Sequence, residues 1–174
     1  MTGSLISLRD ATVQDLPAIV EIYNAAIPQR IATADLVPVS VTNRQAWFDA
    51  HTPYHRPLWV AETKQHPVAG WLSFSSFYGR TAYDATVEIG IYVRPECQRQ
   101  GIGRTLLDRA IADGNLYDLR TLLAYVFAHN TASLRLFEQA GFTEWGYLPC
   151  VAELDGVERD LTILGKRLRP YSRS

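Results

Sequence analysis

The sequence predicts an α/β fold in which a mixed sheet carries helices on both faces. Three observations support this prediction. Apolar runs typical of strands come early in the chain, one strand–helix–strand unit spans residues 86–127, and strand-like runs return near the C-terminus. The 174 residues are 47% apolar and 20% charged, as expected for one soluble domain with a substantial core. We expect a single domain over residues 1–169 and a frayed tail over residues 170–174.

The first 41 residues predict a strand, a helix and a long loop. Residues 5–8 form a short, mostly apolar run that favours a strand. Thr12 is a suitable N-cap for the following helix, because apolar residues recur at helical spacing from Leu16 to Ile27. Residues 28–41 contain two prolines and no periodicity, and the length of this segment suggests a functional loop.

A second helix and a β-hairpin are expected next. Thr42 is expected to cap a short helix, which Pro53 would end because proline disfavours helical backbone in the residue before it. Two apolar runs, residues 58–61 and 68–74, flank the polar turn at residues 65–67 and so predict the hairpin.

The second half of the chain predicts strands that alternate with helices. Residues 122–127 form a continuous apolar run, which indicates an interior strand. Gly141 is expected to end the helix that follows Asn130. The other elements expected here are a strand at residues 86–93, a helix from residue 101 to about residue 115, and late strands at residues 142–148 and 160–168.

A glycine-bearing turn begins the middle helix. Gly101-Ile102-Gly103 follows the strand and a short basic loop at residues 94–100. A helix N-terminus favours anions through its free N–H groups and its dipole, and glycine lets a ligand approach the backbone closely. The turn therefore predicts a phosphate-binding site. Further donors that suit a pyrophosphate surround these glycines: Gln98, Arg99, Gln100 and Arg104.

Two other nucleotide-binding motifs do not fit this turn. A P-loop requires GxxxxGK[ST], and no such string occurs in the chain. A dinucleotide fingerprint requires GxGxxG directly after a strand, whereas here Leu106 stands in place of the third glycine and the basic loop intervenes. Nucleoside triphosphate hydrolysis and dehydrogenase chemistry are therefore disfavoured.

Three motifs, in the same order along the chain, resemble those of the GNAT superfamily of N-acetyltransferases. Gln98–Gly103 fits Q/R-x-x-G-x-G/A and resembles the acetyl-coenzyme A (acetyl-CoA) loop. Ile91–Pro95 resembles the strand-to-loop signature. Asn130–Ser133, followed by Leu136–Phe142, resembles the Asn-x-x-Ser and (Tyr/Phe)-Glu-x-x-Gly-Phe block. In addition, residues 82–88 are similar to the segment before the cofactor strand of phosphinothricin and methionine sulfoximine acetyltransferases.

The resemblance implies a GNAT-like fold with a central, mostly antiparallel twisted sheet, and acetyl-CoA as co-substrate with no metal. It also implies that the pantetheine arm pairs with the exposed backbone of the cofactor strand, that the glycine turn binds the pyrophosphate, and that Asn130 contacts the pantetheine or thioester end. A homodimer is expected from the narrower family. The cofactor-binding residues implied in this way are Ile91, Tyr92, Val93, Arg99, Gln100, Gly101, Ile102, Gly103, Arg104 and Asn130.

Glu88 is the candidate general base. A protonated amine must lose a proton before it can attack a thioester, and a nearby carboxylate can remove that proton directly or through water. Burial among Val87, Ile89 and Ile91 would raise the pKa of Glu88 toward the useful range. A surface acid or a member of an ion pair is the alternative interpretation of this residue.

Phe137 departs from a common superfamily pattern. Many relatives carry a tyrosine at this position, where it is poised to protonate the departing thiolate, and phenylalanine has no proton to give. Tyr125 is an alternative donor, although a structural role in the core strand is the plainer interpretation. The mechanism expected from the sequence therefore depends on Glu88 alone.

The acceptor is expected to be a small amino-acid-like amine. Arg80 would pair with its carboxylate, with Thr81 and Tyr83 beside it, and the loop at residues 28–41 would close over the acceptor. A peptide N-terminus or an antibiotic amine is also compatible with the superfamily. A coenzyme A-binding sensor without catalytic activity is the alternative from a different functional class.

Composition disfavours several other classes of protein. The net charge of −1 argues against a nucleic-acid partner, and no apolar run approaches the roughly 20 residues of a membrane helix. Cys97 and Cys150 give neither a disulfide framework nor a zinc spacing, and Pro53 separates His51 from His55. Because the N-terminus lacks a signal-peptide pattern, we expect a cytoplasmic location.

Overall fold

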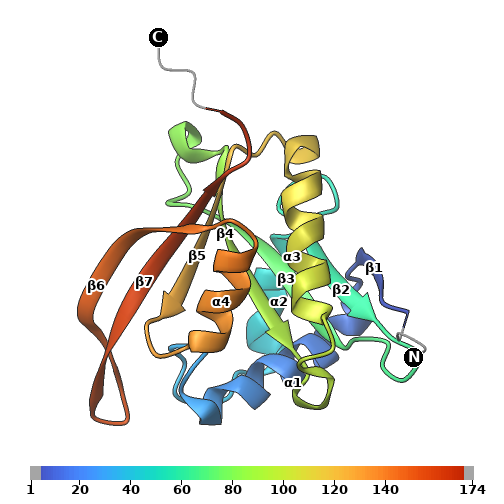
Figure 1. Ribbon diagram of the computed structural model, residues 1–174. Helices are drawn as coiled ribbons and strands as arrows, with labels where there is room; N and C mark the ends of the chain where they lie inside the picture. The colour runs from blue at the N-terminus through green and yellow to red at the C-terminus, as the bar shows by residue number, and fades with distance from the viewer. Residues whose placement is uncertain (1–4, 171–174) are drawn as a thin grey trace.

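The computed structural model of the protein describes residues 5–170 and shows one seven-stranded sheet (Figure 1). The strand order is β1-β2-β3-β4-β5-β7-β6. Only β4 and β5 pair in parallel among the described strands, so the predicted mixed, mostly antiparallel sheet is confirmed. The strands are β1 (Ser7–Asp10), β2 (Leu58–Glu62), β3 (Gly70–Ser76), β4 (Thr86–Val93), β5 (Thr121–Phe127), β6 (Thr143–Leu154) and β7 (Val157–Arg167).

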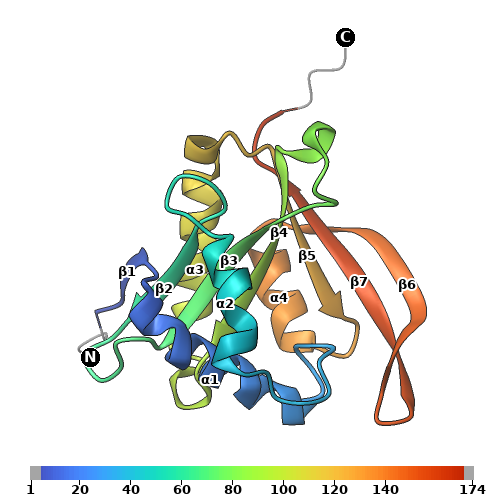
Figure 2. The same ribbon diagram turned by 180° about the vertical axis from the view of Figure 1, so that it is seen from behind.

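Helices cover both faces of the sheet, as predicted. Helices α3 and α4 lie on the face seen in Figure 1, and α1 and α2 lie on the face seen in Figure 2. On the α3 face, Ile102, Leu106 and Leu107 are buried with Phe74 and Ile89 of the sheet. The helices are α1 (Leu16–Ala26), α2 (Val41–Asp49), α3 (Ile102–Asp113) and α4 (Thr131–Gln139), and short 3₁₀ turns lie at Val13–Asp15, Ile27–Gln29, Thr81–Tyr83, Pro95–Cys97 and Gly114–Tyr117.

The core on the opposite face is smaller and richer in aromatic rings. Ile19 and Ile22 of α1 are buried against Val60 of β2 and Trp71 of β3. The Trp71 ring stacks on Tyr92 of β4, with 4.7 Å between the ring centroids. Because side chains alternate across a strand, Tyr92 and Ile89 lie on opposite faces of the sheet.

The sheet opens into a fork between β4 and β5. The two strands pair at Thr86–Thr121, Val87–Leu122 and Glu88–Leu123, and no later pair joins them. Both strands continue beyond this point, because β4 stays paired with β3 as far as Val93 and β5 stays paired with β7 as far as Phe127. The fork therefore begins immediately after Glu88.

Two predictions about the second helix are wrong. Its N-cap is Ser40, not Thr42, because the Ser40 hydroxyl accepts a hydrogen bond from the N–H of Asn43 at 3.1 Å. The helix ends at Asp49, so Pro53 lies beyond its end and does not terminate it. Both serine and threonine are good capping residues, so composition alone could not choose between them.

The first helix is preceded by a 3₁₀ turn and a capping box. Thr12 caps the turn, and the Asp15 carboxylate accepts hydrogen bonds from the Thr12 N–H and from the Arg9 guanidinium, both at 2.7 Å. Ile27, expected at the end of this helix, lies in a separate 3₁₀ turn. The Asp15 side chain is almost completely buried, so this cluster fixes β1 to the start of α1.

Strands β6 and β7 form a long twisted hairpin at one side of the molecule (Figure 1). Asp155 and Gly156 connect them, with φ angles of 52° and 78°. Two consecutive positive φ angles in a two-residue loop are typical of a type I′ turn, for which Asp-Gly is a favoured sequence. No helix within residues 5–170 has the length and apolar character needed to cross a membrane. The tail predicted at residues 170–174 lies outside the described residues except for Pro170.

Candidate active site

The glycine turn forms a backbone cradle at the start of α3. Arg99 and Gly101 have φ angles of 59° and 85°, so the chain turns sharply before the helix. The first helical hydrogen bond runs from the Thr105 N–H to the Gly101 carbonyl at 2.9 Å. The N–H groups of Ile102, Gly103 and Arg104 precede it and have no partner within the helix. These groups and the helix dipole make the cradle suitable for an anion.

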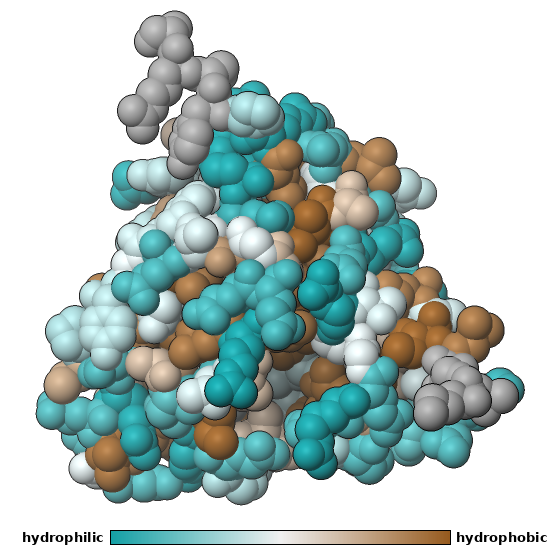
Figure 3. Space-filling view, in the orientation of Figure 1, coloured by the Kyte–Doolittle hydropathy of each residue, from teal (hydrophilic) through white to brown (hydrophobic). Residues whose placement is uncertain are grey.

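A cavity of about 450 Å³ extends from this cradle into the fork. Its volume is within the range of small-molecule sites. Figure 3 shows apolar side chains in the hollow between α3 and α4, with hydrophilic residues around it. The lining residues come from β4 and the cradle (Ile91, Tyr92, Val93, Pro95, Cys97, Gln98, Arg99, Gly101, Ile102, Gly103 and Arg104), from α4 and its cap (Asn130, Ala132, Ser133, Leu136 and Phe137), and from α1 and the loop after it (Ile22, Ala26, Gln29, Ile31 and Ala32).

Gly103 lies where the cavity is narrow. A Cβ atom at this position would lie 3.4 Å from Leu136 and 3.8 Å from both Ile91 and Val93. The absence of a side chain keeps the space between α3, α4 and β4 open. Apolar walls next to an anion cradle fit a molecule that joins a pyrophosphate to a long, weakly polar arm.

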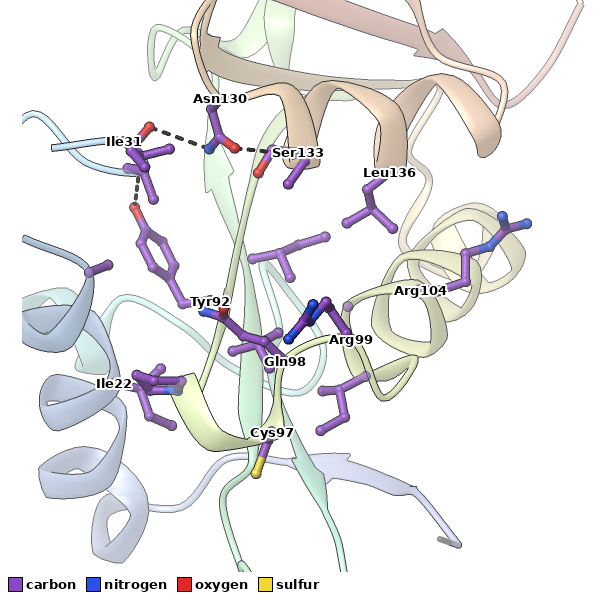
Figure 4. A pocket seen from close by; sticks show the side chains of 18 of the residues that line it. Ile22, Ile31, Tyr92, Cys97, Gln98, Arg99, Arg104, Asn130, Ser133 and Leu136 are labelled. Carbon is purple, nitrogen blue, oxygen red and sulfur yellow. Dashed lines mark hydrogen bonds between the residues drawn. The ribbon is translucent and has the colours of Figure 1, made fainter. Parts of the chain in front are cut away.

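Asn130 connects two parts of the cavity wall (Figure 4). Its side-chain oxygen accepts a hydrogen bond from the Ser133 N–H at 3.1 Å and so caps α4. Its side-chain nitrogen donates to the Ile31 carbonyl at 3.3 Å. The side chain is therefore held by both α4 and the loop after α1.

Glu88 lies at the base of the fork on an interior strand. Its side chain is half-buried, and burial raises the pKa of the Glu88 carboxyl. No ion pair involving Glu88 occurs within residues 5–170, so the alternatives of an edge-strand acid or a salt-bridge partner do not describe it. It does not line the cavity itself.

Gly90 separates Glu88 from the cavity. Glu88, Gly90 and Tyr92 alternate with Ile89 and so lie on the same face of β4, the one covered by α1 and α2. Glu88 and Tyr92 are roughly 13 Å apart along an extended strand. Gly90 adds no side chain to the face between them, and Tyr92 lines the cavity.

Tyr125 lies on the same face of the sheet as Glu88. It is two residues beyond Leu123, the partner of Glu88, and it is only partly buried. Burial raises the pKa of the Tyr125 phenol, and the charges of Glu88 and Tyr78 raise it further. Tyr125 therefore stays a candidate proton donor on the same face of the sheet as the candidate base.

The residues predicted to hold the acceptor lie outside the cavity. Arg80, Thr81 and Tyr83 are exposed on the loop between β3 and β4. The Tyr83 ring packs edge-on against Phe77, with 5.4 Å between the ring centroids. Arg56 fixes this loop, because its buried guanidinium donates to the Asp84 carbonyl at 2.8 Å and to the Ser76 hydroxyl at 2.9 Å.

Most of the predicted cofactor residues come together, but one does not. The cavity is lined by Ile91, Tyr92, Val93, Arg99, Gly101, Ile102, Gly103, Arg104 and Asn130. Gln100 does not line the cavity, and its side chain donates to the Glu96 carbonyl at 3.0 Å. The sequence predicted that the loop at residues 28–41 closes over the acceptor. It did not predict that α1 and Gln29, Ile31 and Ala32 line the cofactor cavity, since a segment without periodicity carries no signal for what it contacts.

Phe137 is buried in the cavity wall. It is 4% exposed and packs against Phe142, with 5.0 Å between the ring centroids. It therefore fills the position of the expected tyrosine without a hydroxyl group. No group of three or more His, Cys, Asp or Glu side chains suited to a metal occurs in the described part of the chain.

Comparison with known proteins identifies the family. Residues 17–142 match the model of the acetyltransferase (GNAT) family. This chain belongs to the GNAT acetyltransferase family. The predicted fold and the predicted class of enzyme, an acyltransferase, are therefore confirmed.

Three GNAT relatives match almost the whole chain. YwnH of Bacillus subtilis, provisionally assigned as a phosphinothricin acetyltransferase, is 47% identical over 94% of this chain and 99% of its own length. The L-methionine sulfoximine/L-methionine sulfone acetyltransferase of Pseudomonas paraeruginosa is 35% identical over 94% of this chain and 95% of its own length. Salmonella typhimurium yncA, solved with its cofactor acetyl-CoA, is 32% identical with a TM-score of 0.89, covering 97% of this chain and 96% of that chain.

Proposed function

We propose that this GNAT enzyme transfers the acetyl group of acetyl-CoA to the primary amine of a small amino-acid-like acceptor of the phosphinothricin or methionine sulfoximine type. The observation that supports the proposal is the fork, which begins immediately after the Glu88–Leu123 pair and whose β4 arm, at Ile91–Val93, lines a cavity shared with the anion cradle. The names of the relatives support the acceptor class.

The residues of the cavity fit acetyl-CoA. The N–H groups at the start of α3 and the guanidinium groups of Arg99 and Arg104 would hold the pyrophosphate. Ile91, Val93 and Leu136 offer an apolar wall to the pantetheine arm. When bound, acetyl-CoA supplies an activated acetyl group as its thioester.

Glu88 would act as the general base for direct attack by the amine. An acceptor ammonium reaching the open face beside Gly90 would transfer a proton to the Glu88 carboxylate, directly or through one water. The half-buried site favours this transfer, because burial raises the pKa of the carboxyl and makes it a better base. Arg80, Thr81 and Tyr83 remain our candidates for the outer part of the acceptor site, on the loop that Arg56 anchors.

The test is a steady-state assay of thiol release with acetyl-CoA and a panel of amines. The panel should contain phosphinothricin, methionine sulfoximine, common L-amino acids, a short peptide and an aminoglycoside. We expect the small amino-acid-like amines, above all phosphinothricin and methionine sulfoximine, to give a higher kcat/KM than the peptide or the aminoglycoside. A clear preference for the peptide or the aminoglycoside would overturn the proposed acceptor class.

The role of Glu88 requires its own variant. Glu88→Gln should lower kcat by about 10²- to 10⁴-fold and leave the KM for acetyl-CoA near its wild-type value. Glu138→Gln is the matched control, because Glu138 is exposed on α4 and lies outside the cavity lining. Wild-type turnover in Glu88→Gln at saturating substrate would exclude Glu88 as the base.

A sensor without catalytic activity makes a different set of predictions. It would bind coenzyme A in calorimetry and release no thiol with any amine of the panel. Phe137 in place of the expected tyrosine is compatible with this alternative, whereas the carboxylate at the base of the fork favours an enzyme.

We also propose that the protein is a cytoplasmic homodimer. Strand β6 has β7 on one side and no partner strand on the other within the described residues. An unpaired strand of this length offers backbone donors and acceptors to another chain. Size-exclusion chromatography with light scattering tests this, and a monomer across the accessible concentration range would exclude the dimer. The exposed apolar side chains on β6 are Trp145, Tyr147, Leu148 and Val151.

A further inference from the structure

A short segment after α1 spans the open end of the fork. We call residues 30–32 the strap. Its three consecutive carbonyl groups each accept a hydrogen bond from a side chain that is distant in sequence: Arg30 O from His129 Nε2 at 2.8 Å, Ile31 O from Asn130 Nδ2 at 3.3 Å, and Ala32 O from the Tyr92 hydroxyl at 3.1 Å. Figure 4 shows Tyr92 and Asn130 converging on this segment.

These three donors belong to the two arms of the fork. Tyr92 is the penultimate residue of β4, and His129 and Asn130 lie in the turn after β5, which ends at Phe127. The arms are joined by strand pairing only as far as Glu88 and Leu123. The strap is therefore a second connection between the arms, at the end opposite to the paired base.

Arg30 fixes the strap to a third part of the molecule. Its Nε and Nη2 donate to the two carboxylate oxygens of Asp155, at 2.7 and 3.1 Å, in the turn between β6 and β7. Its Nη1 donates to the carbonyls of Ile27 and Leu36, both at 3.1 Å. A bidentate arginine–carboxylate pair adds geometric specificity to the attraction between charges.

The backbone of Arg30 also indicates a constrained position. Its φ angle is 53°, in the left-handed region, which is unfavourable for a residue with a side chain. Such a conformation persists where the surroundings fix it from several sides. Here the guanidinium group and the carbonyl of the same residue are both held by partners far along the chain.

We infer that His129 and the Arg30–Asp155 pair are positioning residues that set the width of the fork and so the fit of the cofactor cavity. This inference rests on the proposed function. The strap contributes Ile31 and Ala32 to the cavity wall, so a strap released from one arm would leave that wall displaced. His129 must carry a proton on Nε2, because a carbonyl group only accepts.

The test compares variants that separate the hydrogen bond from the packing of the ring. The imidazole of His129 stacks on Phe127, with 5.5 Å between the ring centroids. His129→Phe keeps an aromatic ring and removes the donor, whereas His129→Gln removes the ring and places an amide donor at a similar reach. Asp155→Asn removes the charge and preserves the turn, because Asn-Gly is also favoured in a type I′ turn.

We expect His129→Phe and Asp155→Asn to raise the Kd for coenzyme A, measured by calorimetry, by about three- to tenfold, and His129→Gln to restore most of the loss. The KM for acetyl-CoA should rise in parallel, with kcat changed less than twofold. The double variant His129→Phe/Asp155→Asn should have a Kd for coenzyme A no higher than that of the single variant that binds more weakly, because both changes release Arg30. Hydrogen exchange of a peptide covering residues 29–36 should accelerate in both single variants.

The possible results separate the two proposals. Wild-type protein that binds coenzyme A, together with variants whose Kd and exchange rates match it within twofold, overturns the role of the strap and leaves the proposed function standing. Wild-type protein that does not bind coenzyme A overturns both. A loss in His129→Phe that His129→Gln does not restore would assign the effect to ring packing and also overturn the role of the hydrogen bond.

Discussion

Glu88 and Leu123 form the last residue pair that joins β4 to β5, so the candidate base lies at the point where the sheet divides. At this position β4 is still paired on both sides, with β3 through Ser75 and with β5 through Leu123. Beyond this pair, no strand among the described residues lies between β4 and β5. This arrangement fixes the backbone of Glu88 at the start of the fork.

The first prediction concerns the pH dependence of turnover. Burial raises the pKa of Glu88, so the carboxylate form becomes available only as the pH rises through this raised value. We expect kcat/KM to increase with pH along a limb whose midpoint lies above the usual glutamate pKa of about 4.3. Glu88→Gln should lack this limb.

Acceptors of different basicity identify the group that causes the limb. A limb that belongs to Glu88 stays at the same pH when the acceptor amine is changed, whereas a limb that belongs to the acceptor moves with the pKa of the amine. Movement of every limb with the acceptor would contradict the assignment to Glu88.

The second prediction concerns Gly90, which separates the base from the cavity. A Cβ atom here would meet the Ser73 hydroxyl oxygen at 3.4 Å and Tyr92 at 3.7 Å, so the fold should accept alanine. Gly90→Ala should nevertheless lower kcat/KM about tenfold or more, because the methyl group occupies the approach to Glu88. Steady-state kinetics and thermal unfolding measure the two effects.

Gly146→Ala on β6 is a closely matched control. Its Cβ atom would lie 3.4 to 3.8 Å from atoms of Ile163, a similar degree of crowding outside the candidate site. This variant should keep wild-type kinetics. Equal losses of activity in the two variants would show that strand crowding, and not access to Glu88, is the cause.

The third prediction separates the two glycines of the cradle. Gly103→Ala should raise the free energy of unfolding by up to about 1 kcal/mol, because alanine favours helix. It should also weaken coenzyme A binding, since the new methyl group narrows the cavity beside Leu136. Gly101→Ala should lower the free energy of unfolding by about 1–2 kcal/mol, because its φ angle of 85° strains any side chain.

Calorimetry and denaturant unfolding distinguish these effects. Greater stability together with weaker binding in Gly103→Ala is the expected signature of a glycine retained for a ligand. Unchanged affinity for coenzyme A in this variant would show that the cofactor does not pass close to the start of α3.

The fourth prediction concerns stability and Asp15. Burial raises the pKa of this carboxyl, but hydrogen bonds from Arg9 and Thr12 outweigh burial, so its pKa is lowered overall. Asp15→Asn should reduce the free energy of unfolding by about 2 kcal/mol at neutral pH. A carboxyl with a lowered folded-state pKa stabilises the protein above its unfolded-state pKa and loses that contribution as the pH falls through the folded-state value.

The difference between wild type and Asp15→Asn should therefore shrink below the usual aspartate pKa of about 3.9. Glu62→Gln is the matched control, because Glu62 pairs with the same Arg9 but is more exposed. We expect this second variant to cost less than about 1 kcal/mol. A larger cost for Glu62→Gln than for Asp15→Asn would contradict the dominant role of the buried carboxyl.

Local patterns in the sequence predicted the part of the site that is built from neighbouring residues. Gly101 and Gly103 mark a turn and a helix start within three residues, and Asn130 marks the cap of the next helix. The apolar runs at residues 86–93 and 122–127 predicted the two strands of the fork. Each of these signals depends on residues close together in the chain, where backbone preferences and periodicity are informative.

Contacts between distant segments could not be predicted in this way. Arg30 and Asp155 are 125 residues apart, and neither lies in a segment with periodicity that indicates a partner. The hydrogen bond from the Gln100 side chain to the Glu96 carbonyl was not predicted either, because a polar residue in a turn can bind nearby backbone as readily as a ligand. The helix cap at Ser40 was missed because two adequate capping residues lie two positions apart.

The parallel pairing of β4 with β5 has a consequence for how the chain folds during synthesis. Strands β1 to β4 form a run of antiparallel neighbours that can pair in the order in which they leave the ribosome. The fork needs β5, which must cross over through α3 before it can lie beside β4. We therefore expect a nascent chain that ends before residue 121 to hold Glu88 on the free edge of a four-stranded intermediate, where it can bind no cofactor in the fork.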